Sequence, residues 1–96
     1  MKVVIEGAGE VGSHLAKLLR AEGHSITVID SDPERLAHLS VYADVETVEG
    51  SASSLRILEQ AGAGTADLYI AEWRCFQITP RVWKTLIAGC SKKINN

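Results

Sequence analysis

Short apolar runs and longer stretches with helical spacing alternate along the first 71 residues. A continuous apolar run indicates a strand covered on both faces of a sheet, and apolar residues three or four positions apart indicate a helix with one buried face. The runs predict strands at residues 2–6, 25–30, 44–49 and 67–71. The helical spacings predict helices at residues 10–22, from residue 33 and at residues 55–61.

This alternation of strands and helices is typical of an α/β fold in which helices connect parallel strands. Because such crossovers are right-handed, we expect the strand order 3-2-1-4 with the first strand in the centre. The predicted fold class is therefore α/β, a partial Rossmann-like doubly wound parallel sheet, with a C-terminal helix. Asp32-Pro33 is typical of a helix start, and Gly23 and Gly62 are typical of residues that end helices.

A glycine-rich turn joins the first strand to the first helix. Gly7, Gly9 and Gly12 have the G-x-G-x-x-G spacing of a dinucleotide-binding turn, in the strand–turn–helix context that this turn requires. Gly7 would allow a tight turn, Gly9 would let a phosphate approach the backbone, and Gly12 would let the helix pack close to the strand. The free N–H groups that begin the helix would then face the phosphates.

Asp30 ends the second strand and follows Gly12 by 18 residues. In a dinucleotide fold, a carboxylate here accepts hydrogen bonds from the adenosine ribose hydroxyls, and its charge repels a 2′-phosphate, so we expect NAD(H) rather than NADP(H). The alternative is that Asp30 and Asp32 only shape a loop and cap a helix, which we favour for Asp32 alone. Ser51 would border the adenine or cap a turn, and His14 would approach a phosphate or face solvent.

The composition of the 96 residues indicates one small soluble domain, because 46% are hydrophobic and no apolar run is long enough to span a membrane. No signal peptide is visible. Cys75 and Cys90 form neither a metal pattern nor a disulfide framework, which fits a reducing cytoplasm. No nucleophile, base and orienting group form a catalytic set, so we expect neither a catalytic residue nor a metal site.

The charge distribution divides the chain near residue 71. Residues 1–71 contain 5 Lys and Arg against 11 Asp and Glu, whereas residues 72–96 contain 5 against 1 and hold both Trp and both Cys. We therefore expect a nucleotide-binding domain at residues 1–71 and a divergent basic tail at residues 72–96, helical at residues 79–90. The tail would be an amphipathic helix for a membrane or partner, a cover for the sheet edge, or foreign sequence from a reading-frame change.

Residues 1–71 resemble the TrkA-N domain, also called KTN or RCK, which is the nucleotide-binding regulatory domain of bacterial Trk and Ktr potassium uptake systems. The resemblance rests on Gly7-Ala8-Gly9-Glu10-Val11-Gly12-Ser13-His14-Leu15-Ala16, Val28-Ile29-Asp30-Ser31-Asp32-Pro33-Glu34-Arg35-Leu36, Val48-Glu49-Gly50-Ser51-Ala52 and residues 55–71. It implies a domain that is truncated after residue 71.

This resemblance implies a cytoplasmic subunit, peripheral to the inner face of the plasma membrane, that gates a membrane potassium transporter by nucleotide-dependent conformational change. The implied cofactor is NAD(H), or ATP and ADP as in some relatives. The subunit would be a homo-oligomer, would not bind nucleic acid and would not be an enzyme. The phosphate turn, the ribose acceptor Asp30, the adenine border and the end of the fourth strand make up the expected cofactor-binding set: Gly7, Ala8, Gly9, Glu10, Val11, Gly12, Asp30, Ser31, Ser51, Ala52 and Ala71.

Three features depart from the family pattern. Glu6 stands where the family usually has an apolar or small residue, and its charge opposes a nearby pyrophosphate. Ser51 stands where many members have Asp, and the resemblance stops at Ala71.

An alternative from another class is the cofactor-binding half of an NAD-dependent dehydrogenase, which would need a substrate site and a proton-transfer residue from elsewhere. A third possibility is a folding-deficient fragment.

Overall fold

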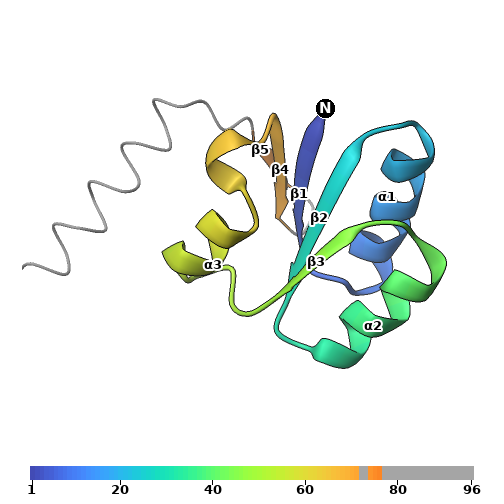
Figure 1. The fold of residues 1–96 in the computed structure, drawn as a ribbon, viewed down its shortest axis with the longest axis horizontal. Helices are drawn as coiled ribbons and strands as arrows, with labels where there is room; N and C mark the ends of the chain where they lie inside the picture. Colours follow the sequence, from blue (N-terminus) through green and yellow to red (C-terminus); the bar gives the residue numbers. More distant parts are fainter. Residues whose placement is uncertain (72–73, 77–96) are drawn as a thin grey trace, which may run out of the picture.

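A computed structural model describes residues 1–71 and 74–76 of the chain (Figure 1). The expected helix at residues 79–90, and with it the alternatives for the tail, lies outside these residues. The elements follow in the order β1 (Lys2–Glu6), α1 (Glu10–Ala21), β2 (Ser25–Asp30), α2 (Pro33–Tyr42), β3 (Glu46–Glu49), α3 (Leu55–Gln60), the 3-10 helix η1 (Ala63–Thr65), β4 (Leu68–Ala71) and β5 (Arg74–Phe76).

The strands form one sheet in the order β3-β2-β1-β4-β5. The first four strands are parallel, which confirms the predicted order 3-2-1-4 with β1 in the centre. In this register Ile5 pairs with Val28 on one side and with Ile70 on the other. The antiparallel strand β5, in which Arg74 pairs with Ala71, was not predicted and occupies the outer edge of β4.

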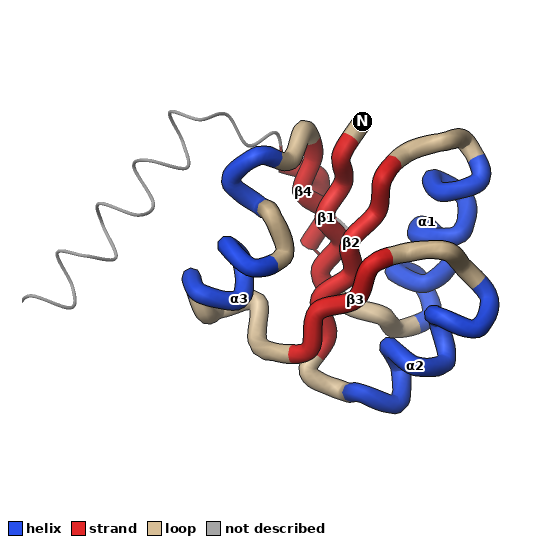
Figure 2. The backbone as a smooth tube through the Cα atoms, in the orientation of Figure 1, coloured by secondary structure: helices blue, strands red, loops and turns tan. Residues whose placement is uncertain are grey.

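Helices cover both faces of the sheet, with α1 and α2 on one side and α3 on the other (Figures 1 and 2). Two apolar clusters fill the spaces between these layers, and every second residue of β1 contributes to the same cluster. The cluster under α1 and α2 contains Val3, Ile5, Ala8, Ala16, Ile26, Val28, Leu36, Leu39 and Ile70. The cluster under α3 contains Val4, Ile29, Val48, Ile57, Ala61, Ala63, Ala66 and Tyr69.

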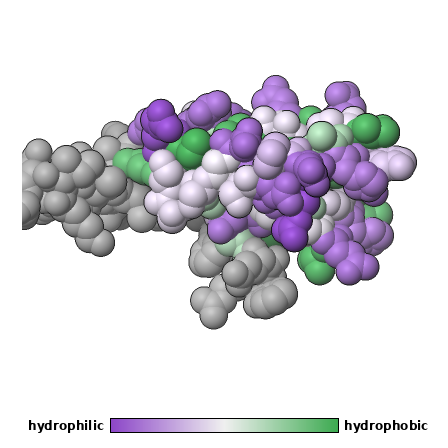
Figure 3. Space-filling model, turned by 90° about the horizontal axis from the view of Figure 1, so that it is seen from below, coloured by the Kyte–Doolittle hydropathy of each residue, from purple (hydrophilic) through white to green (hydrophobic). Residues whose placement is uncertain are grey.

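The carboxyl ends of β1, β2 and β3 lie at one edge of the sheet, because parallel strands all end on the same side. Backbone hydrogen bonds continue past the strand ends: the N–H of Gly7 donates to the Ile29 carbonyl over 2.7 Å, and the N–H of Gly50 donates to the Asp30 carbonyl over 3.0 Å. Seen from this side, the described surface is mostly hydrophilic or neutral, with scattered hydrophobic residues (Figure 3). Ligands of open α/β sheets bind at this edge.

Candidate functional site

The glycine turn has the geometry that its spacing predicts. Gly7 has a φ of 104°, a conformation that favours glycine. A Cβ added to Gly12 would overlap the carbonyl oxygen of Gly7, so the absence of a side chain lets α1 pack against the turn. A Cβ added to Gly9 would meet no atom within 4 Å, so the surface above this residue is open. The first N–H groups of a helix have no intrahelical partners, and no side chain caps α1, so these N–H groups can donate to a ligand.

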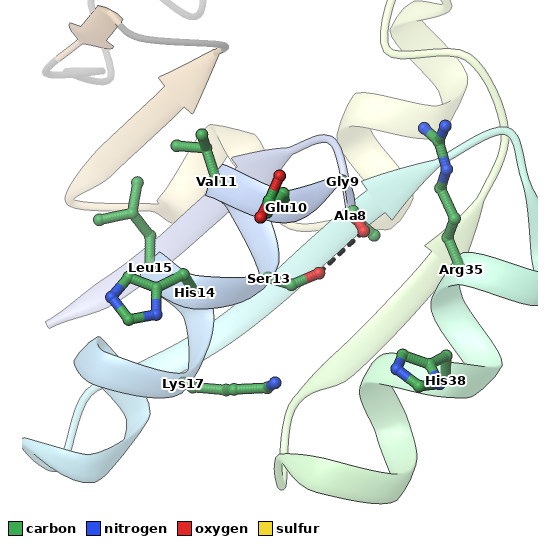
Figure 4. Close-up of a pocket in the computed structure, with 10 residues that line it drawn as sticks. All are labelled: Ala8, Gly9, Glu10, Val11, Ser13, His14, Leu15, Lys17, Arg35 and His38. Carbon is green, nitrogen blue, oxygen red and sulfur yellow. Dashed lines mark hydrogen bonds between the residues drawn. The ribbon is translucent and has the colours of Figure 1, made fainter.

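Ala8 anchors the glycine turn to two neighbouring elements. Its backbone N–H donates a hydrogen bond of 2.7 Å to Oδ2 of Asp30, at the end of β2. Its carbonyl accepts a hydrogen bond of 2.8 Å from Oγ of Ser13, one turn into α1 (Figure 4). The turn is thus hydrogen-bonded both to the Asp30 carboxylate at the end of β2 and to Ser13 of the helix that follows it.

Asp30 is buried, with only 9% of the residue's surface exposed. Its Oδ2 atom accepts from Ala8, and its Oδ1 atom accepts a hydrogen bond of 2.8 Å from the backbone N–H of Asp32. An ionised carboxylate has about four acceptor positions, so the two oxygens keep further capacity for ligand hydroxyls. The structure therefore gives Asp30 a structural role that is compatible with the predicted role in ribose binding.

Asp32 caps helix α2, as the sequence predicted. Its Oδ1 atom accepts a hydrogen bond of 2.9 Å from the backbone N–H of Glu34. Arg35 extends from the same helix, with its Nε atom 3.6 Å from Oδ2 of Asp32 and a guanidinium nitrogen 4.0 Å from Oδ2 of Asp30. Arg35 thus supplies a positive charge beside two carboxylates, a position that its place in the sequence did not predict.

A hollow of about 230 Å³ opens at the carboxyl ends of β1, β2 and β3. It gathers the predicted ribose and adenine residues from two segments of the chain and the start of the glycine turn from a third. Its lining consists of Glu6, Gly7, Ile29, Asp30, Ser31, Gly50, Ser51 and Ala52. Ser51 lines the hollow, and its Oγ atom accepts a hydrogen bond of 3.2 Å from the backbone N–H of Ser53, as expected of a residue that caps a turn. Its role beside an adenine stays a prediction.

A larger groove of about 810 Å³ lies on the other side of the glycine turn, between α1 and α2 (Figure 4). The Lys17 side chain extends from α1 towards α2, and its Nζ atom lies 5.1 Å from the centre of the Tyr42 ring. His38 of α2 packs edge-on against the same ring, with the ring centres 4.9 Å apart. The full lining is Ala8, Gly9, Glu10, Val11, Ser13, His14, Leu15, Lys17, Arg35 and His38.

Glu6, which lines the smaller hollow, forms a side-chain pair with Tyr69. The Tyr69 hydroxyl donates a hydrogen bond of 3.0 Å to Oε2 of Glu6. Burial raises the pKa of Tyr69 well above its ordinary value, and the hydrogen bond and the negative charge of Glu6 raise it further. Tyr69 therefore stays protonated and fixes one oxygen of a carboxylate at the site. Local sequence pattern contains no signal for this pair, because the two residues are 63 positions apart.

Most of the expected cofactor-binding residues lie around the two hollows. Gly12 lines neither of them and acts through its close contact with Gly7. Ala71 also lines neither, although it pairs in register with Glu6. His14 lines the larger groove and is exposed.

Two further properties concern only the part of the chain that the structure describes. Within residues 1–71 and 74–76, no three His, Cys, Asp or Glu side chains lie close enough together to hold a metal ion. No helix in these ranges has the length and apolar character needed to cross a membrane.

Residues 3–73 match the sequence profile of the TrkA-N domain. Over 71 residues, or 74% of this chain, it is 46% identical to the Trk system potassium uptake protein TrkA of Halomonas elongata and 44% identical to that of Haemophilus influenzae. A TrkA homolog from Pyrococcus abyssi is 35% identical over the same length. The matched region spans 16% of each of the first two relatives and 31% of the third.

Proposed function

The chain belongs to the TrkA-N domain family, and on that premise we propose that it is a non-enzymatic, nucleotide-binding regulatory module of a Trk-type potassium uptake system. The observation that carries nucleotide binding is the hydrogen bond between Asp30 and Ala8, which sets a buried carboxylate directly beneath the glycine turn. The hollow beside this pair would hold the adenosine. The open backbone at Gly9 and the uncapped start of α1 would hold the phosphates.

The charges at this edge favour NAD(H) over NADP(H). The fixed carboxylate of Asp30 would accept ribose hydroxyls and repel a 2′-phosphate. Arg35 lies nearby, but its guanidinium already faces Asp30 and Asp32. ATP or ADP is the alternative cofactor, because the adenosine half of the site would be the same and only the groups beyond the adenosine phosphates would differ.

The relatives that carry the name of a potassium uptake protein support the proposed regulatory role. In this role the chain would act at the inner face of the plasma membrane, in a homo-oligomer that contacts a membrane potassium transporter. Nucleotide binding would favour one of two arrangements of the oligomer and so alter the transporter, provided that the nucleotide binds the two arrangements with different affinity. We propose no nucleic-acid partner.

Isothermal titration calorimetry with NADH, ATP and ADP tests this proposal. We expect NADH to bind, and Asp30→Asn to weaken binding by about tenfold or more, as removal of a charged hydrogen-bond acceptor typically does. Asp44→Asn is the matched control, because it removes the same charge from an exposed side chain that pairs with Arg20 at the amino end of β3. Unchanged NADH affinity in Asp30→Asn would contradict the site.

The same samples separate regulation from enzymatic catalysis. A dehydrogenase would reduce NAD with an added substrate and produce the absorbance of NADH. We expect no such change with 2-hydroxy acids, alcohols or aldehydes, alone or with cell extract depleted of protein. Reduction that is lost in Asp30→Asn would support the alternative, a cofactor-binding half of an NAD-dependent dehydrogenase.

A further inference from the structure

Glu6 contributes a second carboxylate to the hollow that holds Asp30. It ends β1 directly before Gly7 and is half-buried. Because side chains alternate along a strand, Glu6 lies on the same face of β1 as Val4, the face covered by α3. Asp30 instead turns to the opposite face, where it meets Ala8. The hollow therefore has a carboxylate on each side.

Tyr69 fixes the position of the Glu6 carboxylate. Glu6 pairs in register with Ala71, so Tyr69 lies two residues earlier on the neighbouring strand and on the same face. Its hydroxyl donates a hydrogen bond to Oε2 of Glu6. Among the described residues, the other carboxylate oxygen has no hydrogen-bond partner, so it remains available to a ligand.

Among the residues that the structure describes, the lining of the hollow includes two carboxylates and no Lys or Arg. An ionised carboxylate can only accept hydrogen bonds, so it attracts N–H and O–H groups and repels anions. Adenosine offers such donors in its 6-amino group and its ribose hydroxyls. A phosphate in the same place would meet two negative charges, and Arg35, which faces Asp30 and Asp32, does not line the hollow.

We propose that Glu6 is a specificity-determining residue of the nucleotide site, where its free oxygen accepts a hydrogen bond from a neutral donor group of the adenosine and disfavours ligands that place an anion there. This proposal rests on the proposed function, because it assigns Glu6 a role in the same site. Tyr69 is a positioning residue, which acts on the ligand only by holding Glu6.

Binding of four ligands to the wild type and to Glu6→Gln tests this role. NADH has both donor types, deamino-NADH lacks the 6-amino group, an NADH analogue with 2′-deoxyadenosine lacks one ribose hydroxyl, and NADPH carries a 2′-phosphate. We expect the wild type to prefer NADH over at least one of the donor-deficient analogues by about tenfold, the usual effect of losing one charged hydrogen bond. Because Asp30 would also favour ribose hydroxyls, the donor that Glu6 binds is identified by the preference that is lost in Glu6→Gln, not by the wild-type preference alone.

Glu6→Gln should reduce that preference to about twofold or less, because an amide can present either an acceptor or a donor. It should also improve NADPH binding relative to NADH. Tyr69→Phe should change the same ratios in the same direction but less, which a purely structural role of the pair would not produce. Glu59→Gln is the matched control, since Glu59 is exposed on α3 and does not line the hollow.

The outcomes separate this assignment from the proposed function. If NADH binds and Glu6→Gln leaves all three ratios unchanged, the role of Glu6 is wrong and the nucleotide site stands. If the folded wild type binds none of the four ligands and neither ATP nor ADP, the proposed function fails and the role of Glu6 fails with it. Circular dichroism of each variant verifies that it is folded before binding is compared.

Discussion

The carboxylate of Asp30 accepts a hydrogen bond from the backbone N–H of Ala8 over 2.7 Å, which joins the end of β2 to the glycine turn 22 residues earlier. The same carboxylate binds the N–H of Asp32. Asp30 is therefore part of the scaffold of the turn as well as a candidate ligand for ribose. Experiments on this residue must separate its effect on folding from its effect on binding.

Asp30→Ala should destabilise the protein by about 1–3 kcal/mol, because it leaves the N–H of Ala8 without an acceptor in a buried position. Asp30→Asn should cost less, since its amide oxygen can still accept one of the two hydrogen bonds. Urea unfolding of both variants measures the difference. Equal stability of Asp30→Ala and the wild type would show that the bond to Ala8 contributes nothing to the fold.

Gly12→Ala should destabilise the protein by about 1–3 kcal/mol or more, the usual cost of overpacking. The added methyl group would overlap the carbonyl oxygen of Gly7, and backbone cannot move aside as a flexible side chain can. Thermal unfolding followed by circular dichroism measures this loss. An unchanged unfolding temperature would mean that α1 does not pack against the turn as described.

Gly9→Ala should leave stability almost unchanged and weaken nucleotide binding. The backbone of Gly9, with φ −71° and ψ −166°, is accessible to alanine, and the new methyl group would meet no protein atom within 4 Å. The methyl group would instead occupy the space of the proposed phosphate. Calorimetry with NADH and a thermal unfolding curve test both parts, and full affinity in the folded variant would place the phosphates elsewhere.

Asp32→Ala should cost about 0.5–2 kcal/mol, the usual effect of losing an N-cap. The side chain accepts the N–H of Glu34 at the start of α2, and asparagine can make the same hydrogen bond. Asp32→Asn should therefore keep most of the stability. If urea unfolding shows the same loss of stability for Asp32→Ala and Asp32→Asn, the charge of Asp32 contributes more to stability than its hydrogen bond to the N–H of Glu34.

Because of Tyr69, the free energy of unfolding should fall as the pH rises above 10.0, the ordinary pKa of a tyrosine side chain. Its pKa is higher in the folded protein, so above pH 10 the unfolded chain releases this proton while the folded protein keeps it, and unfolding becomes more favourable. Below pH 10 both states hold the proton and the stabilisation is complete. Tyr69→Phe should unfold with a weaker dependence on alkaline pH than the wild type, and parallel curves would contradict this linkage.

Elements with strong local patterns were predictable from the sequence. The bounds of β1 and β2 match the prediction, because a residue with a defined role marks the end of each apolar run. Gly7 directly follows β1, and Asp30 is the last residue of β2. The start of α2 was predictable for the same reason, since Asp32-Pro33 stabilises a helix start without any tertiary contact. By contrast, β3 begins at Glu46, two residues later than predicted, because strand ends depend on pairing with β2.

Features that depend on distant contacts were not predictable. The spacing between Gly12 and Asp30 indicated a ligand for ribose, but only the folded chain brings Asp30 to the N–H of Ala8. From the sequence, Glu6 is expected only to be unfavourable beside a pyrophosphate, because no local pattern identifies Tyr69 as the hydrogen-bond donor that holds it. Strand β5 has only 3 residues, too few to show a period.

The antiparallel pairing of β5 determines which sheet edges can take up another polypeptide. A strand has two sides with hydrogen-bonding groups, and β4 uses one for β1 and the other for β5. An additional parallel strand from any other polypeptide could therefore pair with β4 only by competing with β5 for the same backbone groups. While β5 is in place, the described sheet can grow by strand addition only outside β3 or outside β5 itself.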